Sequence, residues 1–108
     1  MTSLDKLISI LKTNCECIAA IQNTPQNILF MVTSENFWQC LPEINRYNIK
    51  FRFLEERKHS LDIHLSLSLH KILFEVTFRI VDYSPGFFAE VMEYFPQAAV
   101  FIQEIKEE

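Results

Sequence analysis

The sequence predicts a single α+β domain, a two-layer sandwich in which N- and C-terminal helices pack on one face of a mostly antiparallel four-stranded sheet. Two observations carry this prediction. Apolar residues recur every three or four positions near both ends of the 108-residue chain, whereas much of residues 49–81 alternates apolar and polar side chains. The first spacing is typical of helices and the second of half-buried strands. The expected order is α-β-(α)-β-β-β-α-α, in one domain over residues 1–108.

The first helix is expected over residues 3–22, because one helical face collects the apolar residues of this segment. They are Leu4, Leu7, Ile8, Leu11, Cys15, Ile18 and Ala19. Pro25 follows, and the residue before a proline is driven out of the helical region, which ends the helix. The continuous apolar run in residues 27–33 then predicts a strand that is at least partly covered on both faces.

Ser34 is the expected N-cap of a short helix that runs through Cys40 and stops near Pro42. After a loop over residues 45–48, a strand of period two begins. The core face of this strand takes Ile49, Phe51 and Phe53, and its outer face takes Lys50, Arg52 and Leu54. The charged residues 55–59 are the expected turn.

Residues 60–69 and 72–80 show the clearest pattern, because the apolar positions change from odd to even between them. A hairpin with an even-numbered loop at residues 70–71 produces this shift if Leu69 faces Ile72. The loop residues His and Lys do not favour a positive φ, so a four-residue loop of the same register is the alternative. The register pairs Leu67 with Phe74, Leu65 with Val76, Ile63 with Phe78 and Leu61 with Ile80 on the core face, and Asp62 with Arg79 and His64 with Thr77 on the outer face.

The C-terminal region is expected to be helical, with Ser84 as N-cap and Pro85 in the first helical position. Gly86, the only glycine of the chain, lies there too, so no glycine remains for a ligand loop. Pro96 either kinks this helix or begins another. The apolar face is expected to hold Phe87, Phe88, Val91, Met92 and Phe95, followed by Ala98, Phe101, Ile102 and Ile105.

Composition excludes several classes of function. One glycine cannot build a Walker A loop or a dinucleotide-binding turn. The net charge of −4 argues against a nucleic-acid partner, because phosphate neutralisation needs an excess of basic residues. No apolar run approaches the roughly 18 residues that cross a membrane. Three cysteines and an N-terminus without a signal pattern favour the cytoplasm, where disulfides are not expected.

The titratable and nucleophilic residues form no catalytic arrangement. Cys15 and Cys17 are two residues apart, a spacing that zinc sites do not use and that points the two thiols to nearly opposite sides of a helix. Ser66 and Ser68 beside His64 follow from strand alternation alone, without a strained turn or helix N-terminus to activate a hydroxyl. We therefore expect no catalytic residue, no metal, no cofactor and no enzymatic activity.

The outer face of the sheet is the expected binding surface, because the helices cover the other face. The aromatic residues of the sheet are all assigned to the core face, so the outer face lacks the stacking platform that RNA-binding sheets use. Leu54 and Val81 are expected to form a small apolar spot beside Ser60 at one edge. The candidate partner-binding residues are Arg52, Leu54, Asp62, His64, Leu73, Glu75, Arg79 and Val81.

These observations predict a small acidic cytoplasmic module that binds through the outer sheet face or an edge strand. An adaptor, an inhibitor or immunity-type protein, and a chaperone or assembly factor all fit. The expected partner is another protein or a second copy of the chain in a homodimer, with neither nucleic acid nor a membrane. The alternative is a carrier of a small molecule or lipid, or a small enzyme, whose pocket between sheet and helices is lined by Phe51, Phe53, Phe78, Phe88 and Met92.

Overall fold

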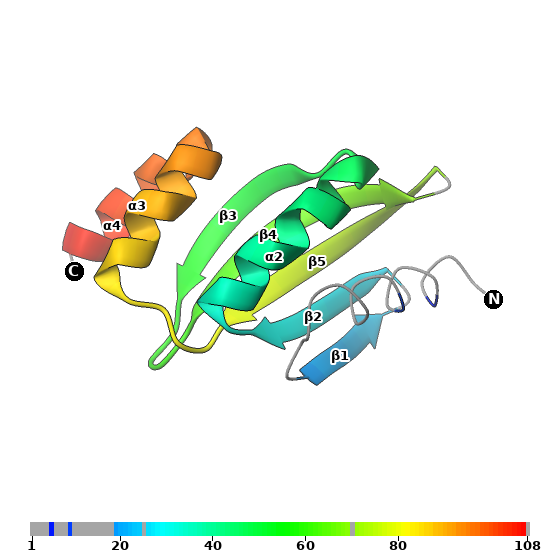
Figure 1. The fold of residues 1–108 in the computed structure, drawn as a ribbon, viewed down its shortest axis with the longest axis horizontal. Helices are drawn as coiled ribbons and strands as arrows, with labels where there is room; N and C mark the ends of the chain where they lie inside the picture. Colours follow the sequence, from blue (N-terminus) through cyan, green and yellow to red (C-terminus); the bar gives the residue numbers. More distant parts are fainter. Residues whose placement is uncertain (1–4, 6–8, 10–18, 25, 70, 108) are drawn as a thin grey trace.

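The computed structural model describes residues 5, 9, 19–24, 26–69 and 71–107 of the chain (Figure 1). The strands of this part are β1 (Ala19–Thr24), β2 (Asn27–Val32), β3 (Lys50–Glu56), β4 (Leu61–Leu69) and β5 (Ile72–Ile80). The helices are α2 (Ser34–Ile44), α3 (Pro85–Tyr94) and α4 (Ala99–Glu107), with short 3₁₀ turns η1 (Asn45–Tyr47) and η2 (Pro96–Ala98). Within the described residues, no helix combines the length and the apolar character that a membrane crossing requires.

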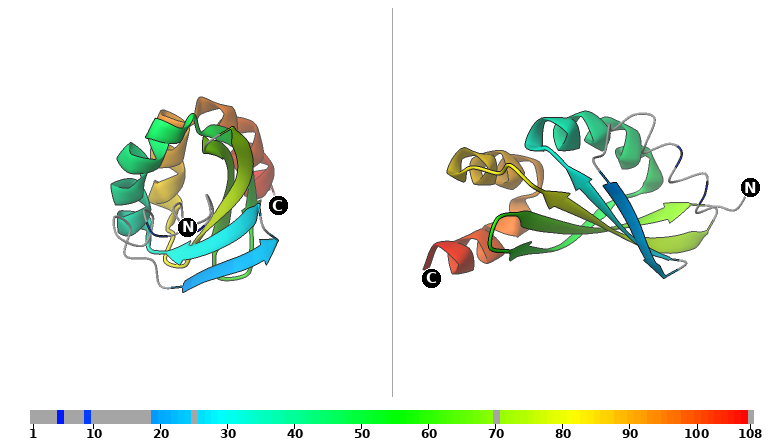
Figure 2. Two further views of the ribbon diagram at one scale, coloured as in Figure 1. Left: turned by 90° about the vertical axis from the view of Figure 1, so that its right-hand side faces the viewer. Right: turned by 90° about the horizontal axis from the view of Figure 1, so that it is seen from below.

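The strands form one sheet in the order β1-β2-β5-β4-β3. β2 and β5 run parallel, whereas the other neighbouring pairs are antiparallel. The helices α2, α3 and α4 flank this sheet (Figure 2). The predicted fold class, an α+β domain with a mostly antiparallel sheet and flanking helices, is therefore confirmed. The four predicted strands correspond to β2, β3, β4 and β5, and β1 adds an edge strand.

The β4–β5 hairpin has the predicted register. Leu69 pairs with Ile72, and the remaining pairs follow in step down to Leu61 with Ile80. Lys71 has a φ of 66°, the left-handed conformation that two-residue hairpin turns require, so the two-residue loop holds despite a residue that does not favour it. His70 lies outside the described residues.

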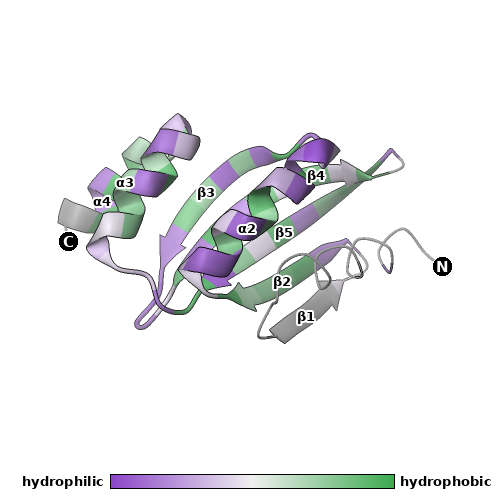
Figure 3. Ribbon diagram, in the orientation of Figure 1, coloured by the Kyte–Doolittle hydropathy of each residue, from purple (hydrophilic) through white to green (hydrophobic). Residues whose placement is uncertain are grey.

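The core lies between the helices and one face of the sheet. Buried and half-buried residues alternate along β2, and the ribbon coloured by hydropathy shows apolar and polar bands along β3 and β5 (Figure 3). Phe78 is fully buried, with its ring centroid 5.8 Å from that of Phe30 and 5.3 Å from that of Phe37 in α2. Phe51 of β3 meets Phe95, just after α3, at 5.5 Å. Aromatic contacts therefore join the sheet to both helical regions.

The N-terminal prediction is wrong for its last turn. Residues 19–22 were expected to end a helix, but they belong to β1, which pairs antiparallel with β2. Pairing satisfies backbone groups that β2 would otherwise expose at its edge, and this tertiary effect outweighs local helical spacing. Asp5 and Ser9 are helical, and the rest of the predicted helix lies outside the described residues.

The helix α2 differs from its prediction at both ends. Thr33, one residue before Ser34, is the N-cap, and its hydroxyl accepts a hydrogen bond from the backbone N–H of Asn36 at 3.2 Å. The helix also continues through Pro42 to Ile44. A proline inside a helix removes one backbone hydrogen bond and crowds the carbonyl four residues earlier, but burial of Leu41 and Ile44 in the core outweighs this local cost.

The C-terminal helices follow their prediction more closely. Ser84 is the N-cap residue of α3, Pro85 is its first residue, and Gly86 lies in its first turn. Pro96 begins a new segment, the turn η2 that leads into α4, rather than kinking one long helix. The predicted apolar faces are buried or half-buried throughout.

The cysteines depart from expectation. Cys40 in α2 is fully buried and disulfide-bonded, while Cys15 and Cys17 lie outside the described residues. Disulfides persist mainly in oxidising compartments. The bond at Cys40 therefore contradicts the expectation of reduced thiols, whereas the cytoplasmic location stays a prediction.

Candidate functional site

The sheet face turned away from the core, here called the open face, carries three rows of side chains that cross the strands. One row holds Arg79, Asp62 and Glu55; the next holds Thr77, His64 and Phe53; the third holds Glu75, Ser66 and Lys50. β2 extends these rows with Met31, Leu29 and Asn27 respectively. The open face is thus mainly polar, with apolar residues at both sides of its middle row.

A β-bulge in β3 decides which residues reach the open face. Phe51 keeps the predicted core side, but Phe53 pairs with His64, so Arg52 is an additional residue in the strand. The bulge places Phe53, 43% exposed, on the open face and turns Leu54, 6% exposed, into the core. The predicted faces of Phe53 and Leu54 were therefore wrong. Regular alternation of residue types gives no sign of an inserted residue.

Asp62 is a buried carboxylate held by two arginines. Its side chain is 1% exposed. Arg57 donates from Nε to Oδ2 at 2.8 Å, and Arg79 donates from Nε to Oδ1 at 2.9 Å and from Nη2 to Oδ2 at 3.1 Å. Burial by itself raises the pKa of Asp62, but the hydrogen bonds from Arg79 and Arg57 outweigh it and hold the pKa below its usual value. Asp62 is therefore ionised at neutral pH and fixes both guanidinium groups.

Glu55 lies directly opposite Asp62, because β3 extends to Glu56 and the turn begins only after it. The prediction that residues 55 and 56 belong to the turn was therefore wrong. Like charges across a ladder repel. Arg57 relieves the repulsion, since its Nη2 lies 3.7 Å from Glu55 while its Nε binds Asp62.

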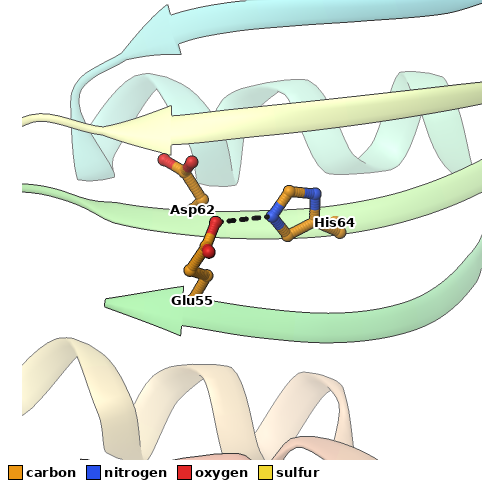
Figure 4. Close-up of side chains that lie close together, drawn as sticks. All are labelled: Glu55, Asp62 and His64. Atoms are coloured by element: carbon orange, nitrogen blue, oxygen red, sulfur yellow. Dashed lines mark ion pairs between the residues drawn. The ribbon is translucent and has the colours of Figure 1, made fainter. Parts of the chain in front are cut away.

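His64 lies between Phe53 and Thr77 at the centre of the open face. Its ring stacks on Phe53 with centroids 4.0 Å apart, and its Nδ1 lies 2.9 Å from Thr77 Oγ1. Its Nε2 is buried and lies 3.6 Å from Glu55 Oε1, too far for a hydrogen bond (Figure 4). Burial lowers the pKa of His64, and the charges of Asp62 and Glu55 only partly oppose this effect. The imidazole is therefore neutral at pH 7.

These groups line a concavity of about 700 Å³ on the open face. Its floor contains Thr77, His64 and Asp62, and Phe53 stands beside them. Its other lining residues are Asn27, Leu29, Phe51, Arg52, Arg57, Leu65, Glu75 and Arg79. This volume falls within the roughly 300–1,000 Å³ typical of ligand-binding clefts.

Glu55, Asp62 and His64 bring one ligand atom each within 4.8 Å of one another, a donor set that metals use (Figure 4). However, both oxygens of Asp62 already accept hydrogen bonds from arginine, and two guanidinium groups would repel a cation. The arrangement therefore fits an ion-pair network better than a metal site.

The hydroxyl beside His64 belongs to Thr77 and not to the serines considered from the sequence. A hydroxyl, an imidazole and a carboxylate follow one another from Thr77 through His64 to Glu55, which is the order of a nucleophilic triad. Thr77 is only 8% exposed, and the contact from His64 to Glu55 is too long to orient the ring. We therefore assign this chain of contacts to positioning rather than catalysis.

The structure brings together five of the eight predicted partner-binding residues. Arg52, Asp62, His64, Glu75 and Arg79 all line the concavity. Leu54 is in the core, so the predicted apolar spot that included it does not form.

The two remaining predicted residues lie outside the lining. Leu73 is 59% exposed near the hairpin end of β5. Val81 is half-buried in the turn after β5, where its backbone N–H binds the carbonyl of Val32 at 3.1 Å.

Sequence reasoning missed Arg57 and placed Phe53 on the wrong face, as part of a pocket between sheet and helices. The open-face position of Phe53 could not be found, because only the bulge moves it. Arg57 had a weak signal: a buried aspartate requires compensating cations, and a turn residue next to the strand end is within reach of Asp62. Its backbone N–H binds the carbonyl of Ser60 at 2.8 Å, which closes the turn and directs Arg57 back over the sheet.

Comparisons of the chain with protein-family models, with curated proteins and with solved structures found no match. The geometry of the open face therefore carries the functional argument alone.

Proposed function

We propose that this chain is a non-enzymatic protein-binding module and that its partner docks on the concave open face. The observation that carries the proposal is Phe53, an aromatic ring 43% exposed on a concave polar surface. Arg52 and Arg57 line the same concavity, and aromatic and arginine side chains are the types most enriched in protein interfaces.

Preorganisation supports the same proposal. Asp62 fixes Arg57 and Arg79, and His64 holds the ring of Phe53 by stacking. Side chains that are already ordered lose less conformational entropy on binding, which leaves more of the contact energy for affinity. A surface whose polar groups are mutually paired also presents few unsatisfied groups to a partner.

The test is affinity recovery from cells of the source organism with three baits: the wild-type chain, Phe53→Ala, and Glu104→Gln as a matched surface control on α4. A partner that docks on the open face should be recovered by the wild type and by the control and lost, by about tenfold or more, from the Phe53 variant. Recovery of the same proteins in equal amounts by all three baits would contradict the proposal.

A homodimer is one form of the proposal, because a second copy is also a protein partner. Sedimentation velocity of the wild type and of Phe53→Ala separates this case from a foreign partner. A dimer formed through the open face should dissociate in the Phe53 variant, and a dimer unaffected by the substitution would place its interface elsewhere.

The volume of the concavity favours a second candidate function, the binding of a small molecule. The predicted pocket lay between sheet and helices, but Phe53 lies on the other face and Phe78 is fully buried there. The concavity on the open face replaces it as the place for a ligand. Native mass spectrometry of the purified chain decides between the two functions, since a carrier retains ligand mass and a protein-binding module does not.

A further inference from the structure

A second hollow, of about 410 Å³, lies on the helical side of the molecule. It is lined by Trp38 of α2 and by Glu90, Glu93 and Tyr94 of α3. Two aromatic rings and two carboxylates thus share one small surface, here called the α2–α3 hollow. None of these four residues belongs to the open face, so the function proposed above does not use them.

Packing fixes the aromatic wall of the α2–α3 hollow. The ring of Trp38 lies 5.0 Å from that of Phe37, 5.4 Å from that of Phe87 and 5.9 Å from that of Tyr94. Trp38 and Tyr94 are tilted by 47° to one another, so they form two adjoining walls. Tyr94 in turn packs against Phe95 at 5.0 Å, and it remains 43% exposed.

Two exposed carboxylates line the hollow beside these rings. Glu90 and Glu93 are exposed, and neither forms an ion pair with any residue of the described part. The helix α3 contains no basic residue at all, so no neighbour along its own surface neutralises them. Helical spacing puts Glu90 on the same side as Phe87 and Tyr94, three residues after one and four before the other.

We propose that the α2–α3 hollow binds a basic side chain, the ammonium of lysine or the guanidinium of arginine, presented by a partner protein. The face of a tryptophan or tyrosine ring attracts a cation through its quadrupole, and the adjacent carboxylates attract its charge. The methylene stem of lysine or arginine meets the apolar rings while the charged head reaches Glu90 and Glu93. A neutral apolar side chain would leave both carboxylates unpaired, so charge complementarity selects the cation.

Trp38 makes the test direct, because it is the only tryptophan of the chain and reports on the hollow by its fluorescence. The full chain is titrated at constant ionic strength with N-acetyl-lysine amide, N-acetyl-arginine amide and N-acetyl-norleucine amide. The last probe keeps the four-carbon stem of lysine and lacks its charge. Both basic probes should change the fluorescence of Trp38 saturably, and the norleucine probe should not.

Variants separate the contribution of the carboxylates. In the double variant Glu90→Gln/Glu93→Gln the dissociation constant of the basic probes should rise by about fivefold or more, the effect of two surface ion pairs. The control Glu104→Gln, on α4, should bind as the wild type does. The affinity of the wild type should also fall as salt is added.

An equal response to the norleucine probe, or an unchanged affinity in the double variant, would overturn the proposal. Phe53→Ala should bind the basic probes as tightly as the wild type, because Phe53 lies on the other side of the molecule. Failure of the hollow to bind a cation is therefore distinct from failure of the open face to bind a partner.

Discussion

The open face and the α2–α3 hollow both contain charged groups beside aromatic rings, but they compensate those charges differently. On the open face, the buried carboxylate of Asp62 receives three hydrogen bonds from two arginines. In the hollow, Glu90 and Glu93 have no ion-pair partner among the described residues. Charge on the open face is therefore part of the fold, whereas charge in the hollow is available to a partner.

This difference in charge compensation determines which interactions each region can offer to a partner. The network around Asp62 holds Arg57 and Arg79 in place, so a partner meets an ordered surface and gains little by displacing its internal ion pairs. Phe53, which projects beside the network, is the group that a partner can bury. The hollow offers the opposite combination, a rigid aromatic wall and carboxylates with unused capacity to bind a cation.

The largest expected effect is that of Asp62→Asn, which removes the compensating charge but keeps the shape. The free energy of unfolding should fall by about 3 kcal/mol, because breaking a buried ion pair leaves the guanidinium of Arg79, 23% exposed, without its carboxylate. Urea unfolding monitored by Trp38 fluorescence measures this decrease in the free energy of unfolding. A loss below about 1 kcal/mol would show that solvent already screens this network and would remove the contrast between the two regions.

The next effect tests the bulge, which decides the composition of the open face. Leu54→Ala should lower the free energy of unfolding by about 2–3 kcal/mol, because it leaves a cavity in the core. Phe53→Ala should lower it by only about 1 kcal/mol, since the ring is partly exposed and its main contact is the stack on His64. The same urea unfolding compares the two neighbours. If Phe53→Ala instead caused the larger loss, β3 would alternate regularly without the bulge, and Phe53 would lie in the core rather than on the open face.

These two neighbours also show how far sequence reasoning reaches. The register of β4 and β5 was predictable, because β4 alternates over nine residues, β5 alternates from Phe74 onward, and the change of parity defines the loop. From this register the pairs Asp62–Arg79 and His64–Thr77 follow, which is most of the floor of the concavity. The site could be predicted where regular alternation continues.

The parts that sequence reasoning missed depend on contacts between segments. The bulge at Arg52 interrupts a stretch whose residue types fit a regular strand equally well. Residues 19–22 form part of the strand β1 instead of the end of a helix, because their backbone pairs with β2. The aromatic contacts between α2 and α3 depend on how these two helices cross. Local spacing contains no information about any of these, which is why neither the open-face position of Phe53 nor the α2–α3 hollow was predicted.

A smaller effect is expected from pH and concerns His64. Burial lowers the pKa of His64 in the folded chain, so the unfolded chain takes up the proton first as the pH falls. The stabilising effect of the neutral ring is complete above the unfolded-state pKa of about 6.5. It is lost as the pH falls from there through the folded-state pKa, by about 1.4 kcal/mol for each pH unit between the two values.

Urea unfolding at a series of pH values measures this loss. The charged groups that face His64 are Asp62, Glu55 and Arg57. His64→Gln should remove the decrease, whereas His59→Gln, in the exposed turn, should keep it. A decrease that survives in His64→Gln would mean that another group causes it.

The smallest effect has the opposite sign and sharpens the comparison most. Glu93→Gln should raise the free energy of unfolding by about 0.3 kcal/mol, because Glu90 and Glu93 are like charges three residues apart on one helix. Glu93→Gln and Asp62→Asn each remove one negative charge from the same chain of net charge −4, so net charge cannot explain a difference between them. Thermal and urea unfolding of the two variants, measured in parallel, give the sign of the change in the free energy of unfolding for each. A destabilisation of more than about 1 kcal/mol in Glu93→Gln would mean that the chain itself compensates this carboxylate, and the hollow would then have no charge to offer a partner.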